Sequence, residues 1–340
     1  MKHSERRPCL DNTSLTGESG SVELPPTVFR VILEAISRNI RSVILLAVTG
    51  IIWGASTTAT APVSGSITVD PSTSLIHSGQ RAQAIQTLLN GVRTAKPPQR
   101  KLLIQKSRVL ARIFLTNKTF QLYQDGLNSL NAKKYRAARE KFEKALSEES
   151  DNSEVLFRLG QSLIFDGEAE AAVKYLKMAK SISPYESEVG LWLGRALFLK
   201  GDFKEAQAEL GPAWGELKKT EMATLWFSET LVQLGQGGQA LRLLENDAKT
   251  SPFHLQSLIL AASLRLQHGS EDPQNLILAQ KNIKLASTRL EDPGFQKFKN
   301  ELRDPDLGVS LQKSKQDLSE EIQKLTKQIQ DRLTVSSAQR

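Results

Sequence analysis

Small residues recur every 34 positions through the middle of the chain, and leucines and aromatic residues lie between them with the spacing of a helix face. Three series share this period: Gly126, Gly160, Gly194, Ser228 and Ala262; Ala138, Ala172, Ala206 and Ala240; and Gly167, Gly201, Gly235 and Gly269. Each unit is therefore predicted to be two helices joined by a turn, where the third series supplies the positive φ that ends a helix. We expect the small residue of the first helix to face the alanine of the second. Neighbouring units must stack, because one pair cannot bury its apolar face alone.

The spacing within one unit resembles the tetratricopeptide family. The matching residues are Leu156, Leu159, Gly160, Leu163, Ala172, Leu176, Ala179 and Pro184, and the likeness extends over residues 119–290. The first unit departs from the pattern with Asp125 and Ser129 at apolar positions, and the fifth carries about five extra residues after Gly269. The resemblance implies an all-α solenoid of about four to five repeats over residues 119–304. We expect one transmembrane helix before this solenoid and a C-terminal helix after it.

Proteins of this family bind peptides or helices on a concave face formed by the first helix of each unit. By spacing, the candidate binding residues are Tyr123, Leu127, Phe157, Gln161, Phe165, Arg195, Phe198, Glu229 and Gln233. Most are apolar, which favours an apolar helix or extended segment as ligand. The alternative is that Phe157, Phe165 and Phe198 pack between repeats, and the same question applies to Trp192, Trp214 and Trp226.

Residues 42–69 contain no charged side chain. We predict a transmembrane helix over residues 42–62, since about 20 helical residues cross a bilayer. A signal peptide would begin closer to the N-terminus, and a buried core helix would not be apolar all round. Arg30, Arg38 and Arg41 precede the stretch and no basic residue follows it before Arg81. The positive-inside rule therefore predicts a cytoplasmic N-terminus.

The sequence around this predicted span divides into further segments. Residues 1–24 are predicted to be a disordered cytoplasmic tail, and residues 25–41 an amphipathic juxtamembrane helix or an extension of the span. Residues 63–118 are expected to be a basic linker with a helical second half, in which one helix runs over residues 101–130. A glycine-centred stretch, residues 61–70, faintly resembles the first strand of periplasmic membrane-fusion adaptors, but no long coiled-coil hairpin follows it.

The predicted linker carries charge of one sign. Between Asp70 and Asp125 it has nine Lys and Arg residues and no acidic residue. Such a stretch is typical either of a solvated helix face or of contact with anionic lipid or another polyanion. We expect no nucleic-acid partner, because the predicted topology places this stretch on the non-cytoplasmic side.

The last segment, residues 305–340, contains a heptad-like apolar stripe. Its members are Leu311, Leu318, Ile322, Leu325, Ile329 and Leu333. The stripe predicts a C-terminal helix that forms a coiled coil with a copy of itself or another protein. The alternative is a helix that packs on the end of the solenoid and caps it.

Composition narrows the chemistry. Of 340 residues, 39% are hydrophobic and 24% charged, with a net charge of +8, which excludes a disordered or polytopic membrane protein. The single cysteine, Cys9, excludes an intramolecular disulfide and a cysteine-based metal centre, and the four histidines are scattered. No phosphate-binding loop or Gly-x-Ser-x-Gly motif occurs. We therefore expect no catalytic activity, cofactor or metal.

Together these features predict a single-pass protein of the inner (plasma) membrane whose C-terminal bulk is extracytoplasmic, and periplasmic in a bacterium. Its predicted role is a scaffold or adaptor that binds partner proteins and helps to assemble or stabilise an envelope complex of the secretion, motility or wall-assembly type. The alternative is a periplasmic chaperone-like module that captures apolar segments of exported proteins. A third hypothesis, a cytosolic solenoid similar to mitochondrial import receptors, would require the opposite topology.

Overall fold

The computed structural model describes residues 71–217, 220–268, 272–295 and 313–338. The chain divides into two units, Met1–Ser66 and Ile67–Arg340, and every described residue belongs to the second. The predicted tail (1–24), juxtamembrane helix (25–41), transmembrane helix (42–62) and strand-like stretch (61–70) lie outside the described residues. Within the described ranges, every helix is too short or too polar to cross a membrane.

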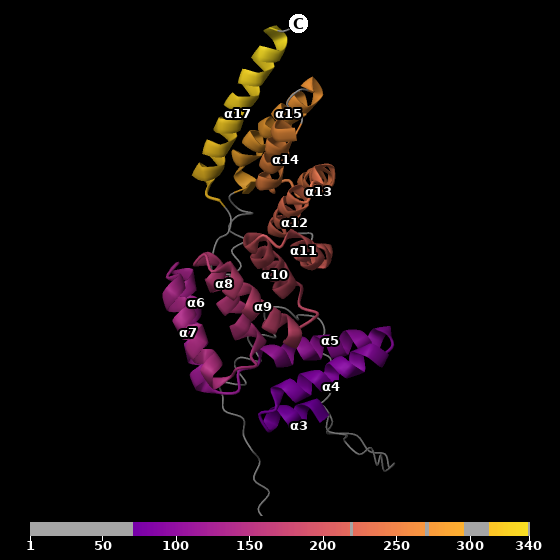
Figure 1. The fold of residues 1–340 in the computed structure, drawn as a ribbon, viewed down its shortest axis with the longest axis vertical. Coiled ribbons are helices and arrows are strands. Elements are labelled where there is room, and N and C mark those ends of the chain that lie inside the picture. Colours follow the sequence, from indigo (N-terminus) through magenta and orange to yellow (C-terminus); the bar gives the residue numbers. More distant parts are fainter. Residues whose placement is uncertain (1–70, 218–219, 269–271, 296–312, 339–340) are drawn as a thin grey trace, which may run out of the picture. The chain divides into compact units, whose positions relative to one another are not determined.

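The regular structure of the described residues is helical (Figure 1). The helices are α3 (Pro71–His77), α4 (Arg81–Thr94), α5 (Pro97–Arg112), α6 (Asn117–Asn131), α7 (Tyr135–Glu148), α8 (Ser153–Phe165), α9 (Ala169–Ile182), α10 (Ser187–Lys200), α11 (Phe203–Leu217), α12 (Glu221–Gln233), α13 (Gly237–Thr250), α14 (Leu255–His268), α15 (Pro273–Leu290) and α17 (Lys315–Ala338). From α6 to α15 consecutive helices form pairs, and each pair packs on the next. The prediction of an all-α helical repeat is confirmed.

The recurring small residues make room for a large side chain in the second helix. A Cβ atom placed on Gly126 would lie 2.5 Å from Phe142 Cε1, and one on Gly160 would lie 2.5 Å from Leu176 Cγ. The prediction that the small residue faces the alanine of the second helix is therefore wrong. Its partner is the leucine or phenylalanine four residues after that alanine, which fills the space that a side chain on the glycine would need.

The turn between the two helices of a unit requires a left-handed backbone. Gly167, Gly201 and Gly235 have φ values of 85°, 96° and 74°, as the sequence predicts. In the first unit Lys133 occupies the equivalent position with φ 58°. A side chain in this conformation is strained, because Cβ approaches the following carbonyl oxygen.

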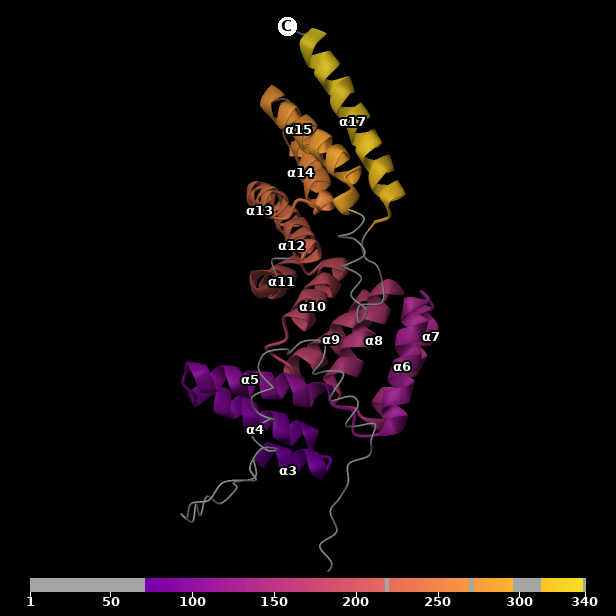
Figure 2. The ribbon, with the colours of Figure 1, turned by 180° about the vertical axis from the view of Figure 1, so that it is seen from behind.

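The segment predicted to be a linker is helical from residue 71 onwards. Helices α3, α4 and α5 pack in sequence, and the turn between α4 and α5 ends at Pro97, the first residue of α5 (Figure 2). The single helix expected over residues 101–130 is wrong, because the chain leaves the helix at Ile113 and begins α6 at Asn117. Glu149 holds this break by accepting hydrogen bonds from the N–H groups of Leu115 and Thr116, each at 2.9 Å.

Two hydrophobic clusters form the core. The first extends from α6 to α14 and the second from the end of α13 to α17. Leu318, Ile322, Leu325 and Ile329 of the C-terminal stripe are buried in the second cluster, where α17 packs against α15 and α14 (Figure 2). Arg332 Nη1 adds a 2.6 Å hydrogen bond to the carbonyl of Leu266. The structure thus uses the stripe as a cap, and a coiled coil through it would require α17 to leave the repeats.

Candidate functional site

The predicted binding residues lie on the first helices of the repeats, in register with one another. Helices α8, α10 and α12 carry three rows of residues spaced by 34 positions, which we call the first-helix face. The rows are Arg158, Trp192 and Trp226; Gln161, Arg195 and Glu229; and Phe165, Leu199 and Gln233. The members of one row occupy equivalent positions in successive repeats. A ligand that runs along the array would therefore contact one row repeatedly.

The predicted residues differ in how much surface they offer. Tyr123 and Phe157 are 7% and 1% exposed and belong to the first hydrophobic cluster. Phe157 therefore supports the packing alternative, and Tyr123 offers little surface to a ligand. Gln161 is also buried. The half-buried members are Leu127, Phe165, Arg195, Phe198 and Glu229, and Gln233 is exposed.

Aromatic rings form a continuous line through the face. The ring of Phe165 stacks on Tyr135, with centroids 5.2 Å apart, and meets Trp192 edge-on at 5.6 Å. Trp192 in turn meets Trp226 edge-on at 5.1 Å, although the two residues belong to different repeats. Trp192 is 2% exposed, so its role is packing, while Trp226 remains partly accessible.

Arg195 lies at the centre of the accessible part. Its guanidinium lies over the rings of Phe198 and Trp226, with Cζ 5.0 and 5.2 Å from the centroids. Nη1 pairs with Glu229 Oε2 at 2.6 Å, one repeat further along. The two charged side chains are 22% and 36% exposed. An arginine fixed by two rings and one carboxylate keeps its remaining N–H donors in place for a ligand at little entropic cost.

Leu199 was missed by the sequence analysis. It is 46% exposed although apolar, and it lies one repeat after Phe165 and one repeat before Gln233. The 34-residue period, extended from Phe165, would have found it. Aromatic residues and arginine are enriched in protein interfaces, and Leu199 adds exposed apolar surface next to Phe198.

An ionic network borders the face at the start of α8. Glu154 Oε1 accepts hydrogen bonds from Arg158 Nε at 2.8 Å and from the Tyr123 hydroxyl at 3.0 Å. Arg112 of α5 pairs with Glu154 Oε2 at 3.3 Å. Burial alone raises the pKa of Glu154, but Arg158 and Arg112 outweigh it and lower the pKa to about 2. Burial, and then the Glu154 carboxylate, raise the pKa of Tyr123.

Gln161 extends this network toward the face. Its Oε1 accepts a hydrogen bond from Arg158 Nη1 at 3.2 Å. Its Nε2 is buried without a hydrogen-bond partner. A buried donor without a partner costs free energy, and at 1% exposure Gln161 offers no surface at which a ligand could supply one.

Basic side chains of the N-terminal helices attach to the starts of the repeat helices. Arg112 pairs with Glu186 at 3.3 Å, in addition to Glu154, and Arg108 lies 3.7 Å from Glu216. Arg81, which has no exposed surface, pairs with both Glu149 and Asp151. These pairs connect α4 and α5 to several repeats at once.

A second buried polar cluster lies between α12, α13 and α14. Asp247 Oδ2 accepts a hydrogen bond from Ser257 Oγ at 2.6 Å and lies 2.9 Å from His254 Nδ1. Glu221 accepts from the Ser257 N–H at 3.1 Å. Burial raises the pKa of Glu221 to about 7, and His254 offsets this only in part. The aspartate binds serine and histidine side by side, whereas in a Ser-His-Asp triad the histidine lies between them.

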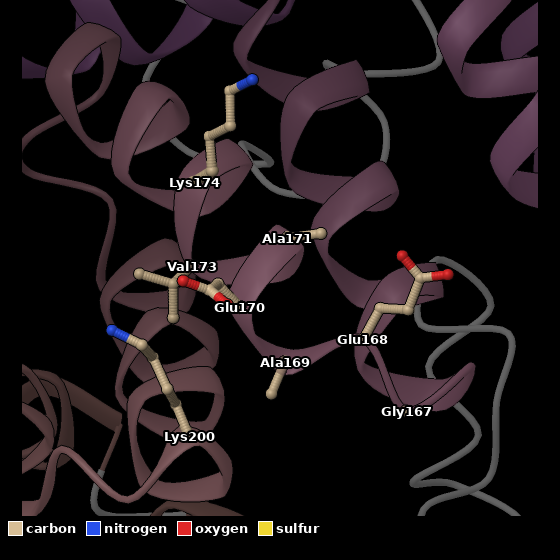
Figure 3. Close-up of a pocket in the computed structure, with 8 residues that line it drawn as sticks. All are labelled: Gly167, Glu168, Ala169, Glu170, Ala171, Val173, Lys174 and Lys200. Carbon is tan, nitrogen blue, oxygen red and sulfur yellow. The ribbon is translucent and has the colours of Figure 1, made fainter.

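A hollow of about 800 Å³ opens at the start of α9. Its lining residues are Gly167, Glu168, Ala169, Glu170, Ala171, Val173, Lys174 and Lys200 (Figure 3). Their charged groups do not converge on one point in Figure 3, and Lys200 pairs with Asp202 at 2.9 Å. Among the described residues no group of three His, Cys, Asp or Glu side chains is placed to hold a metal.

Comparison with known proteins gives one family match and several similar solved structures. Residues 129–189 match a family model described as tetratricopeptide repeat. No curated protein matches the chain. Solved structures similar to it include MamA, at 19% identity over 52% of this chain and 96% of MamA, with a TM-score of 0.43. TTC0263, a thermophilic TPR protein in Thermus thermophilus, is 20% identical over 56% of this chain and 94% of its own, with a TM-score of 0.42. YrrB, a TPR protein with an unusual peptide-binding site, is 15% identical over 53% of this chain and 91% of its own, with a TM-score of 0.41.

Proposed function

We propose that this chain is a membrane-anchored scaffold whose first-helix face binds a segment of a partner protein. The observation that carries the proposal is the accessible cluster of Arg195, Phe198, Trp226 and Glu229 with exposed Leu199 beside it. Tryptophan and arginine are the residues that most often dominate the energy of protein interfaces. Their presence together on the first-helix face favours a protein ligand over a small molecule.

The chemistry of the face favours one kind of segment. Leu199 and the rings of Phe198 and Trp226 would contact apolar side chains of an amphipathic helix or extended strand. Arg195 is a donor, so a carboxylate or backbone carbonyl of the ligand would pair with it. Glu229 would limit the face to ligands that leave its pairing with Arg195 intact or replace it with a basic group.

The membrane location is part of the proposal. It is supported by the uncharged stretch of residues 42–69 and by the basic residues on its N-terminal side. We place the N-terminus in the cytoplasm and the repeats outside it, where the partner would belong to an envelope complex. A C-terminal reporter that is active only outside the cytoplasm should be active, and activity of a cytoplasmic reporter instead would reverse the topology.

Site-specific photocrosslinking in the full chain tests the binding face. A photoreactive amino acid at Gln233, which is exposed at the end of the third row, should give one crosslinked species of constant size. The same group at Met178, which is 40% exposed on the second helix of its repeat, serves as the control and should give none. Many weak products at Gln233 would indicate the chaperone-like alternative, and identical products at both positions would exclude the face as the site.

A further inference from the structure

Eight of the nine basic residues between Asp70 and Asp125 divide into two groups by their contacts. Arg81, Arg108, Arg112 and Lys118 pair with acidic residues of the repeats. Arg93, Lys96, Arg100 and Lys101 are all exposed, and no ion pair joins them to a described residue. The first group explains how α4 and α5 are held on the repeats, whereas the second takes no part in this attachment.

The second group gathers at the closed end of the α4–α5 hairpin, which we call the hairpin tip. Arg93 lies in the last turn of α4, Lys96 immediately precedes α5, and Arg100 and Lys101 lie near the start of α5. The first turn of α5 contains no acidic residue. Positive charge at the N-terminus of a helix opposes the helix dipole. Arg93, at the C-terminus of α4, is favourably placed, but helix stability does not account for Lys96, Arg100 and Lys101 at the start of α5, which points to a ligand of opposite charge.

Exposed apolar side chains follow the charges along α5. Leu102 and Val109 are 50% and 53% exposed, and they are seven residues apart, which places them on the same side of the helix. Ser107 and Ala111, which are buried, lie on the opposite side. A surface with basic residues and exposed leucine or valine side by side is typical of contact with a lipid interface.

We propose that the hairpin tip binds the headgroups of anionic phospholipids, with Leu102 entering the interface. The four basic side chains would pair with lipid phosphates, and the chemistry is complementary because no acidic residue lies between Asp70 and Asp125. Chain connection supports the same partner, since α3 begins at Pro71, two residues after the uncharged stretch of residues 42–69 ends. The inference rests on the proposed membrane location.

A fluorescent probe at the tip tests this in the full chain. Cys9→Ser removes the single cysteine, and Leu102→Cys then carries an environment-sensitive dye. After reconstitution, the dye emission should shift to the blue in vesicles of phosphatidylcholine with phosphatidylglycerol, and lipids with a quencher in the acyl chain should quench it. Both effects should be absent in pure phosphatidylcholine. A dye at Ile277→Cys, which is 57% exposed on α15, should not distinguish the two lipids.

A charge-neutral variant provides the decisive comparison. R93Q/K96Q/R100Q/K101Q should lose the blue shift at Leu102→Cys while the chain stays in the vesicles. When vesicles are added to the protein in solution, each basic residue near an anionic surface strengthens binding roughly fivefold. The variant should therefore bind these vesicles several hundredfold more weakly. An unchanged shift in the variant, or equal emission in both lipids, would overturn the proposal.

Failure of the membrane anchor gives a different result. If residues 42–62 do not span the bilayer, alkaline carbonate will release the chain from reconstituted vesicles. The tip would still respond to added phosphatidylglycerol vesicles if the lipid surface is correct. Binding of a nucleic acid or an acidic protein to the tip, without a response to anionic vesicles, would replace lipid as the partner and reject the inference.

Discussion

Two first helices of the repeat array each bury a glutamate in their first turn, and the two carboxyl groups respond to burial in opposite ways. The pKa of Glu154 in α8 falls to about 2, while that of Glu221 in α12 rises to about 7. The difference lies in their partners. Arg158 and Arg112 surround Glu154 with positive charge, whereas Glu221 has mainly a backbone N–H and the His254–Asp247 pair. Burial alone therefore does not decide the charge of a buried carboxyl group.

This contrast predicts opposite pH dependence for the two halves of the array. The lowered pKa of Glu154 stabilises the fold at pH values above its ordinary pKa, and this contribution is lost as the pH falls from about 4.5 toward about 2. The raised pKa of Glu221 means that the folded state holds the proton more tightly. Stability therefore falls as the pH rises from about 4.5 to about 7.

The largest expected effect comes from breaking the N-terminal network. Arg158→Met leaves Glu154 buried with Arg112 as its remaining cationic partner, and removal of one partner of a buried pair typically costs about 3–5 kcal/mol. The free energy of unfolding of the purified full chain, followed by circular dichroism in urea at pH 7, measures this. Arg136→Met, whose side chain is 89% exposed, is the control and should change nothing measurable. Equal effects of the two variants would contradict the role of the network.

Neutralising Glu221 should change the free energy of unfolding in the opposite direction. Glu221→Gln keeps an acceptor for the Ser257 N–H and removes the cost of a buried charge, so it should stabilise the chain at pH 8 by up to about 3 kcal/mol. The gain should shrink as the pH is lowered to 5, which urea unfolding at several pH values would show. A loss of stability at pH 8 would mean that the carboxylate is compensated by its surroundings.

The same two halves differ at the small-residue position. Gly160→Ala would place Cβ 2.5 Å from Leu176 and should cost about 1–3 kcal/mol through overpacking. Ser228 takes the equivalent position in α12, and its hydroxyl is buried without a hydrogen-bond partner. Ser228→Ala should therefore stabilise the chain by about 1 kcal/mol. Thermal unfolding measures the stability of both variants. A change in the same direction for the two would contradict this explanation.

The smallest expected change in stability concerns the turn between α6 and α7. Lys133→Gly should relieve the left-handed strain at φ 58° and stabilise the chain by up to about 1 kcal/mol. Lys144→Gly, at an exposed position inside α7, should destabilise it by about 1 kcal/mol through helix propensity. The pair of variants separates the turn from a general effect of glycine. A loss of stability in Lys133→Gly would show that the lysine side chain contributes more than its backbone costs.

The fold could be predicted because its signal repeats. The 34-residue period identified the helix pairs and the turn glycines, since each unit meets the same packing requirement. The partner of the small residue was wrong because the period shows which positions are small, but not which side chain of the next helix fills the space. The break between α5 and α6 was missed because Glu149, which holds it, lies more than thirty residues away in sequence.

The candidate site was predictable only in part. Spacing placed Gln161, Arg195 and Glu229 in one row, but it could not separate buried Phe157 from accessible Trp226, because both are aromatic residues on first helices. The division of the basic segment was also hidden, because Arg112 and Lys101 look alike until the positions of Glu154 and Glu186 are known. Contacts between distant segments carry no signal in the local pattern.

The central claim, that the first-helix face binds a partner protein through Arg195, is tested most directly by combining the Gln233 crosslinker with Arg195→Ala. This substitution removes the cation held over Phe198 and Trp226 and its pairing with Glu229, and leaves the buried core residues in place. The account predicts that the crosslinked species falls at least about tenfold in yield while the melting temperature of the chain stays close to that of the wild type. An undiminished crosslink in a folded Arg195→Ala chain would contradict it.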